Sequence, residues 1–235
     1  AARRGNLRRQ VPEGRATVGK KLARLAIRML TALMALIGRI CYRIEGLEHL
    51  PRHGPCLLLL NEIGFMGTIA LAMSIARLVL TGRMAEPVGV TVEDTMGFSP
   101  WGGVMRLGQV ITVPPGLGQS PASLWAALKA LQAGQIVVMN GDGEISWDGG
   151  PPPLQAGVAW IALRSGVPVV PFVATYTAYE LWPRWAERPH ATGYLTVRCG
   201  RPFTLAEVPT ERVDEATLAR ANEIIARHMH AAIYE

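Results

Sequence analysis

Short apolar runs alternate with helical segments from about residue 55 onward, and this alternation limits the possible folds more than any other feature. The runs are rich in Val, Ile and Leu and are bounded by Gly, Pro or Asn, which is typical of buried strands. The predicted strands are 55–61, 88–94, 108–113, 135–140, 167–176 and 194–200. The predicted helices are 64–82, 97–107, 120–133, 155–165 and 214–233. This order predicts an α/β domain with a mostly parallel sheet flanked by helices.

The helix boundaries rest on residues with restricted or unusual backbone preferences. Ser120 can cap the helix that begins at Pro121, because proline fits the first helical position. Glycines follow three of the predicted helices, at Gly82, Gly134 and Gly166. Glycine readily adopts the left-handed conformation that ends a helix, so we expect each helix to stop there.

Positive charge is concentrated at the start of the chain. Residues 1–28 hold nine Arg or Lys and one acid, a charge of +8, whereas the whole chain carries +6. Such an arm attracts nucleic acid, an anionic membrane or an acidic protein surface. The arm has no interleaved aromatic residues and no nucleic-acid recognition motif follows it, so we expect no nucleic-acid partner.

The next segment favours a membrane as the partner of the arm. Residues 17–43 show apolar residues at helical spacing, with basic residues on one flank. The longest uncharged run, 29–38, has ten residues, whereas a membrane-spanning helix needs about 20. The pattern predicts a helix that lies in the membrane interface, and the alternative is a core helix with a solvated basic tail. The predicted organisation is an arm at 1–16, this amphipathic helix at 17–43 and the α/β domain at 44–235.

The cysteines indicate a reducing compartment. Cys41, Cys56 and Cys199 are widely spaced and odd in number, which fits neither a disulfide framework nor a metal motif. The first 20 residues contain no apolar stretch of the kind found in a signal peptide. We therefore expect a peripheral or monotopic protein on the cytoplasmic face of a membrane, without a metal or cofactor.

Two glycine-rich loops follow predicted strands. The stretch NEIGFMG follows the first strand, and NGDGEISWDGG follows the strand at 135–140. Ligands in open α/β sheets bind beyond the carboxyl ends of the strands, and glycine lets the backbone approach them closely. The first loop offers Glu62, and the second offers Asp142, Glu144 and Ser146.

Several blocks in this order resemble the glycerophospholipid acyltransferases, the 1-acylglycerol-3-phosphate O-acyltransferase group. The blocks are GPCLLLLN at 54–61, DGEISWDG at 142–149, VPVVP at 167–171 and VRCGRPF at 197–203, and the resemblance spans roughly residues 22–208. It implies an acyltransferase-like α/β fold with a membrane-bound N-terminal helix. For an active member it also implies transfer of an acyl group from acyl-CoA or acyl-acyl carrier protein to a lysophospholipid or another alcohol.

The sequence departs from that family's first motif, Asn-His-x-Ser-x-x-Asp. In the family, the His is the general base and the Asp orients it. Asn61 is kept here, but Glu62 stands at the His position, Gly64 at the Ser position and Gly67 at the Asp position. The chain has five histidines, at 49, 53, 190, 228 and 230, and we expect none of them in a strand-end loop beside this site.

The departures continue in the family's phosphate-binding motifs. The segment matching the second motif, GQVITVPPG, has no arginine, and Arg106 precedes it. In the third motif, Phe-Pro-Glu-Gly-Thr-Arg-Ser, the Glu becomes Asp142, Gly143 is kept and Ile145 replaces the Arg. The sequence therefore lacks both the base and the cations that bind a phosphate group.

From these differences, our main hypothesis is that the chain is a catalytically degenerate acyltransferase-like protein. It would have a structural or regulatory role in a membrane complex. It would bind membrane lipid through residues 17–43, and it would also bind a protein partner. It could retain a lipid in the groove where active members of the family bind their substrate. The candidate lipid-binding residues are Asn61, Gly64, Gly143, Ser146 and Trp147. The alternatives are an active O-acyltransferase and a simple lipid carrier. In the active case Glu62, Asp142 or Glu144 would be the base; otherwise Glu62 caps a helix or pairs with an arginine.

Overall fold

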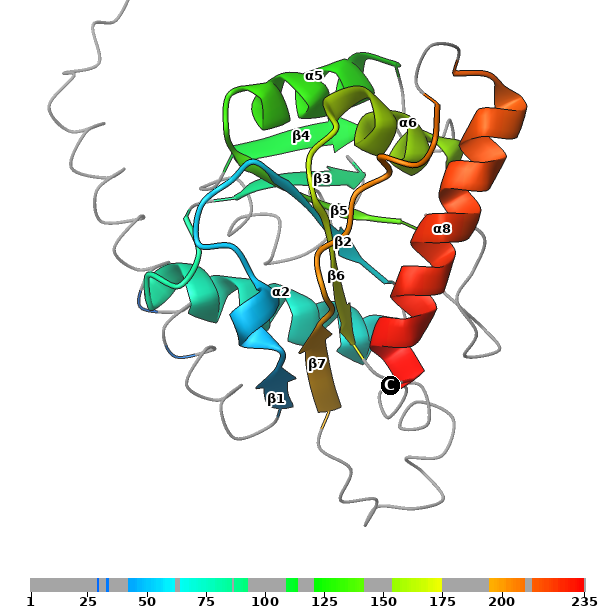
Figure 1. Ribbon diagram of the computed structural model, residues 1–235. Helices are drawn as coiled ribbons and strands as arrows, with labels where there is room; N and C mark the ends of the chain where they lie inside the picture. Colours follow the sequence, from blue (N-terminus) through cyan, green and yellow to red (C-terminus); the bar gives the residue numbers. More distant parts are fainter. Residues whose placement is uncertain are drawn as a thin grey trace, which may run out of the picture.

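A computed structural model describes a seven-stranded sheet and the helices around it (Figure 1). The described residues are 29, 33, 42–61, 64–85, 87–92, 109–113, 121–141, 154–174, 195–209 and 213–234. The strands are β1 (Tyr42–Glu45), β2 (Cys56–Leu60), β3 (Val88–Val92), β4 (Gln109–Val113), β5 (Ile136–Asn140), β6 (Val169–Ala174) and β7 (Leu195–Cys199). The helices are η1 (Leu47–His49), α2 (Gly64–Leu80), α5 (Pro121–Gln132), α6 (Ala156–Ser165) and α8 (Glu215–Tyr234).

The sheet is mostly parallel, as the alternation of strands and helices predicts. Its strand order is β1-β7-β6-β2-β5-β3-β4. The five strands from β6 to β4 run in one direction, whereas β7 is antiparallel to β6 and parallel to β1. The carboxyl ends of the five parallel strands therefore meet at one edge of the sheet, called the carboxyl edge below.

The alternation of side chains along the strands produces a three-layer structure. On β2, Leu57 and Leu59 join the cluster formed with α5, α6 and α8, whereas Cys56 and Leu58 join the cluster formed with α2. All four side chains are buried, so β2 is covered on both faces (Figure 1). This burial explains why the central strands are continuous apolar runs instead of alternating apolar and polar residues.

Most of the predicted elements are confirmed within a few residues. The glycines predicted to end helices adopt positive φ angles: 66° at Gly82, 81° at Gly134 and 63° at Gly166. The sequence predicted neither strand β1 nor the short helix η1. Tyr42 and Arg43, expected at the end of the amphipathic helix, lie in this strand and pair with Leu195 and Thr196 of β7.

Arg198 links the last strand of the sheet to its neighbours. Its Nε atom donates to Oε2 of Glu45 on β1 at 3.3 Å, and a terminal guanidinium nitrogen donates to the carbonyl oxygen of Ala232 near the end of α8 at 3.2 Å. The second contact satisfies a carbonyl in the last turn of a helix, where a positive charge is favourable. One side chain thus joins β1, β7 and α8.

Some predictions fall on residues outside those described. The arm at 1–16, the helix predicted at 97–107 and most of the segment 17–43 are among them. The division of the chain into arm, amphipathic helix and domain therefore stays a prediction.

The two buried thiols provide a test of the packing. Burial raises the pKa of both Cys56 and Cys199 from the ordinary 9.0 to about 12, and a thiol reacts as its thiolate. In a Cys41→Ser variant at pH 8, we expect neither thiol to react with a disulfide reagent until urea unfolds the chain. A Lys129→Cys variant on the exposed side of α5 should react at once. Equally rapid reaction of the native Cys56 or Cys199 would contradict this packing.

Candidate functional site

The candidate site lies at the carboxyl edge, where β2, β5 and β6 end beside one another. Leu60, the last residue of β2, is in register with Asn140 of β5 and with Phe172 of β6. The two glycine-rich loops begin immediately after Leu60 and Asn140. The prediction that both loops start at one edge of the sheet is therefore confirmed, and their starting points are on adjacent strands.

Asn61 extends the pairing between β2 and β6 beyond the backbone ladder. Its Nδ2 atom donates to the carbonyl oxygen of Ala174 at 2.9 Å, and its Oδ1 accepts from the amide of Ala174 at 2.8 Å. The side chain of Asn61 is only 3% exposed. The amide thus replaces one rung of the sheet at the point where the two strands diverge, and it satisfies two buried backbone groups.

Gly141, where the second loop starts, is hydrogen-bonded to both Leu60 and Gln155, the latter beside the point where the chain re-enters the described fold. The Gly141 amide donates to the carbonyl oxygen of Leu60, and its carbonyl oxygen accepts from the amide of Gln155, both at 3.0 Å. A Cβ at Gly141 would lie 2.7 Å from Cδ2 of Leu154, so a side chain there would require Leu154 to shift. Segment 142–153 therefore leaves and rejoins the described fold at neighbouring points.

Helix α8 contacts the same place from one face of the sheet. Nδ2 of Asn222 donates to the carbonyl oxygen of Leu154 at 3.2 Å. Its Oδ1 is buried and has no hydrogen-bond partner among the residues that the structure describes. This contact ties the return of the second loop to the C-terminal helix.

The structure describes two of the eight predicted site residues. Asn61 is buried beside Ala174, and Gly64 is the first residue of α2. Glu62, Asp142, Gly143, Glu144, Ser146 and Trp147 lie outside the described residues, so their roles stay predictions. The bond between Asn61 and Ala174 was not predicted, because its partners are 113 positions apart.

Four of the five histidines are described, and three of them have contacts with other residues of the fold. His49 lies 3.1 Å from the carbonyl oxygen of Cys199, and His53 is exposed in the turn before β2. His228 stacks on Phe203 at 3.9 Å between ring centroids, and His230 packs beside Tyr234. Burial, followed by the nearby Arg227, lowers the pKa of His228. His190 lies outside the described residues.

The described parts of the chain contain no candidate metal site. There, no three His, Cys, Asp or Glu side chains come together as a metal site would require. The chemistry that the site can perform therefore depends on the residues that follow Asn61 and Gly141.

The Asn61 amide yields a stability prediction. Asn61→Ala would leave the buried amide and carbonyl of Ala174 unpaired, at about 1–3 kcal/mol for each group. We expect the free energy of unfolding, measured with urea, to fall by about 2–6 kcal/mol. The matched control is Gln135→Ala, because Gln135 bonds to Gln109 on the surface and its loss should cost less than about 0.5 kcal/mol. Equal effects of the two changes would contradict the role of Asn61.

Comparison with known proteins identifies the fold. No protein-family profile and no curated protein matches the chain. Among solved structures, the 1-acyl-sn-glycerophosphate (LPA) acyltransferase PlsC from Thermotoga maritima is similar, with a TM-score of 0.55 and 17% sequence identity. The match covers 88% of this chain and 81% of that one. The chain therefore has the fold of the 1-acylglycerol-3-phosphate acyltransferases.

Proposed function

We propose that this chain is a catalytically degenerate acyltransferase-like protein that serves as a structural or regulatory subunit at a membrane. The observation that carries the proposal is the pairing of the Asn61 side chain with Ala174. Asn61 is thereby held at the carboxyl edge, and the next residue in the sequence is Glu62 instead of a histidine. The sequence has kept the residue that builds the edge and has replaced the one that performs catalysis in the acyltransferases it resembles.

The acidity of a carboxyl group argues against Glu62 as a replacement base. A general base must have a suitable pKa and must reach the acceptor hydroxyl. The unperturbed pKa of Glu is about 4, so Glu62 would be a much weaker base than His. At the position where an Asp would orient the base, Gly67 has no side chain.

The loss of cationic positions supports the same conclusion. A phosphate head group is best held by arginines that form paired, charge-assisted hydrogen bonds. Ile145 stands at the third-motif arginine position, and the segment matching the second motif has none. A lysophosphatidic acid acceptor would therefore lose both its base and its anchors.

The alternative is an active acyltransferase, which the intact arrangement of the scaffold favours. The two loops still start on adjacent strands, at Leu60 and Asn140, and Glu62 and Asp142 each follow two residues later in the sequence. Contrary to the expectation from the sequence, His190 is a further candidate base for this alternative, because the segment that contains it follows the carboxyl end of β6, the neighbour of β2.

Acyl transfer provides the direct test. Release of the thiol should be followed with acyl-CoA and acyl-acyl carrier protein donors and 1-acylglycerol-3-phosphate as acceptor. We expect no turnover above the uncatalysed rate, and no difference between the native chain and Glu62→Gln or His190→Gln. Turnover that is lost in Glu62→Gln or His190→Gln, but kept in the control Glu48→Gln on η1, would overturn the proposal.

Membrane association is part of the proposal and rests on the N-terminal segment. Met29 and Leu33 are helical and lie four positions apart, so they share one face of the helix. Their exposed fractions are 66% and 53%, which is unusual for large apolar side chains on one face. A lipid surface would cover these side chains, and the basic residues of 1–28 would face anionic head groups. In the described residues, no helix is long and apolar enough to span a bilayer.

Vesicle flotation tests this role with a matched pair of variants. Met29→Glu with Leu33→Glu should reduce binding to anionic vesicles by tenfold or more, because each buried apolar side chain contributes about 1.5–3 kcal/mol. Leu80→Glu, at an exposed apolar position on α2, should leave binding unchanged. Equal binding by the native chain and the double variant would contradict the proposed contact.

A further inference from the structure

Helices α5 and α6 lie side by side on one face of the sheet (Figure 1). Each leads from the carboxyl end of one parallel strand to the start of another, so the two helices run in the same direction. Near the start of α5, the Ser123 hydroxyl donates to the carbonyl oxygen of Thr112 in β4 at 3.1 Å. Just before α6, the Gln155 amide donates to the carbonyl oxygen of Gly141 at 3.0 Å. The first turns of both helices are therefore attached to the carboxyl edge.

One tryptophan from each helix lies near this end, and the two rings are in contact. Trp125 of α5 and Trp160 of α6 meet edge to face, with 5.4 Å between ring centroids. Trp160 is partly buried against the core, whereas Trp125 is 55% exposed. Pro121 and Ala122, in the first turn of α5, are exposed as well. The N-terminal part of α5 thus presents an apolar surface centred on an indole ring.

A cation follows each tryptophan by four positions, on the same side of its helix. Lys129 follows Trp125, Arg164 follows Trp160, and both cations are exposed. Four residues of helix rise about 6 Å, so two cations lie one turn behind two tryptophans. Neither helix contains an acidic residue, and in the described part of the chain neither cation forms an ion pair. This surface is called the tryptophan face below and comprises Ala122, Trp125, Lys129, Trp160 and Arg164.

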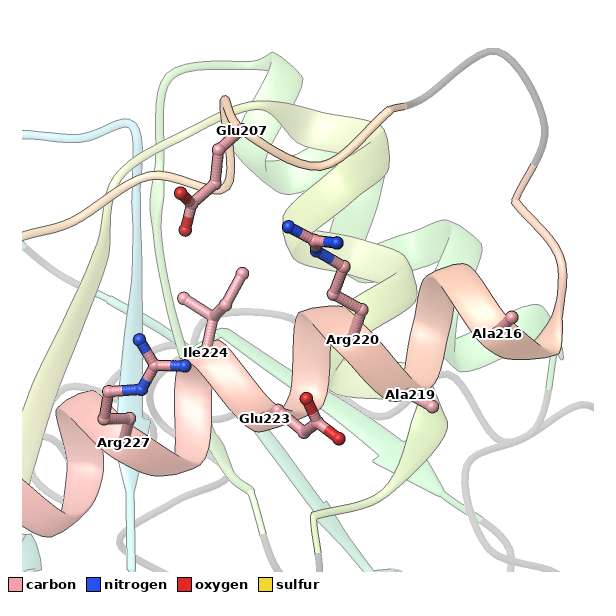
Figure 2. A pocket seen from close by; sticks show the side chains of 7 residues that line it. All are labelled: Glu207, Ala216, Ala219, Arg220, Glu223, Ile224 and Arg227. Carbon is pink, nitrogen blue, oxygen red and sulfur yellow. The ribbon is translucent and has the colours of Figure 1, made fainter.

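The outer side of α8 shows how unusual this arrangement is within the fold. Arg220 and Arg227 alternate there with Glu223, around a hollow that Glu207 also lines (Figure 2). Two positive and two negative side chains balance, so this part of α8 does not attract a surface of either charge. The tryptophan face is positive throughout, and an anionic surface is therefore attracted to α5 and α6 instead.

We propose that the tryptophan face is a second membrane contact, in which the indole of Trp125 enters the head-group region of an anionic bilayer. Tryptophan concentrates at membrane interfaces because its ring is apolar and its N–H group is polar. Lys129 and Arg164, about 6 Å further from the bilayer centre, meet the lipid phosphates. Their long stems cover apolar surface while their charges stay in water. Each such cation strengthens binding to an anionic membrane about fivefold.

This contact gives the chain an orientation on the membrane. The N-terminal ends of α5 and α6 are attached to the carboxyl edge, so the edge from which both glycine-rich loops start is turned toward the lipid. The inference rests on the proposed membrane association, to which it adds this orientation. It does not depend on whether the chain is an active acyltransferase.

A polarity-sensitive fluorophore attached at a single position tests the contact in the full chain. Ala122→Cys carries the probe on the exposed side of α5, one turn before Trp125. A Cys41→Ser background is used, in which Cys56 and Cys199 are buried and escape labelling. We expect the emission at position 122 to shift to the blue when vesicles of phosphatidylcholine and phosphatidylglycerol are added, because the probe leaves water.

Two further probe positions separate this contact from the N-terminal one. The same fluorophore at Leu33→Cys reports the contact proposed for the N-terminal segment. At Leu80→Cys, an exposed position on α2 at the opposite face of the sheet, we expect no shift.

Variants of the tryptophan face show whether its side chains cause the shift. Trp125→Gln removes the indole, and Lys129→Glu with Arg164→Glu reverses the two cations. We expect either change to abolish most of the shift at position 122 and to leave the shift at position 33. The matched control is Arg52→Glu with Arg83→Glu, which changes the net charge equally at exposed positions near the opposite edge of the sheet. It should leave the shift at position 122 in place.

Each contradicting result has a distinct meaning. A shift at position 33 without one at 122 would overturn the tryptophan face and leave the proposed membrane association standing. A shift at 122 without one at 33 would support this face and contradict the N-terminal contact. Equal shifts at 122 and 80, or a shift at 122 that the face variants leave unchanged, would overturn the inference. A shift caused by polyglutamate but not by vesicles would overturn it too, and would assign the face to an acidic protein.

Discussion

The hydrogen bonds between the Asn61 side chain and the backbone of Ala174 hold the part of the structure on which the rest depends. They join the ends of β2 and β6 at the centre of the carboxyl edge, where the backbone ladder stops. Gly141 is bonded to Leu60 at the same place, so the starting points of both glycine-rich loops are fixed relative to each other. These contacts are made by Leu60, Asn61, Gly141 and Ala174, so the proposed loss of catalysis at Glu62 would leave them in place.

The sequence was informative where local chemistry decides the structure. The buried strands are continuous apolar runs, and glycines at 82, 134 and 166 end helices through positive φ angles that glycine adopts readily. Strand β1 could not be predicted, because Tyr42 and Arg43 continue a helix-like pattern and their pairing partners are about 150 positions away in β7. The role of Asn61 depends on Ala174 in the same way, since a long-range partner leaves no local pattern.

In this chain, the evidence for the fold is separate from the evidence for the function. A likeness at 17% identity establishes the acyltransferase fold, but activity depends on particular side chains placed on that fold. The sequence retains Asn61 at the sheet edge, and it has Glu62 and Ile145 at the positions of the base and of a phosphate-binding arginine in the acyltransferases that it resembles. The proposed loss of catalysis would leave the exposed side chains of Met29 and Leu33 as a surface for binding.

The most direct test of catalytic loss is genetic complementation of a bacterium whose own 1-acylglycerol-3-phosphate acyltransferase can be switched off. The chain should be produced at a level at which an active acyltransferase restores growth, with its presence in the membrane fraction verified. If catalysis is lost as proposed, the chain, although present, does not restore growth. Growth restored by the native chain and abolished by Glu62→Gln or His190→Gln would contradict it.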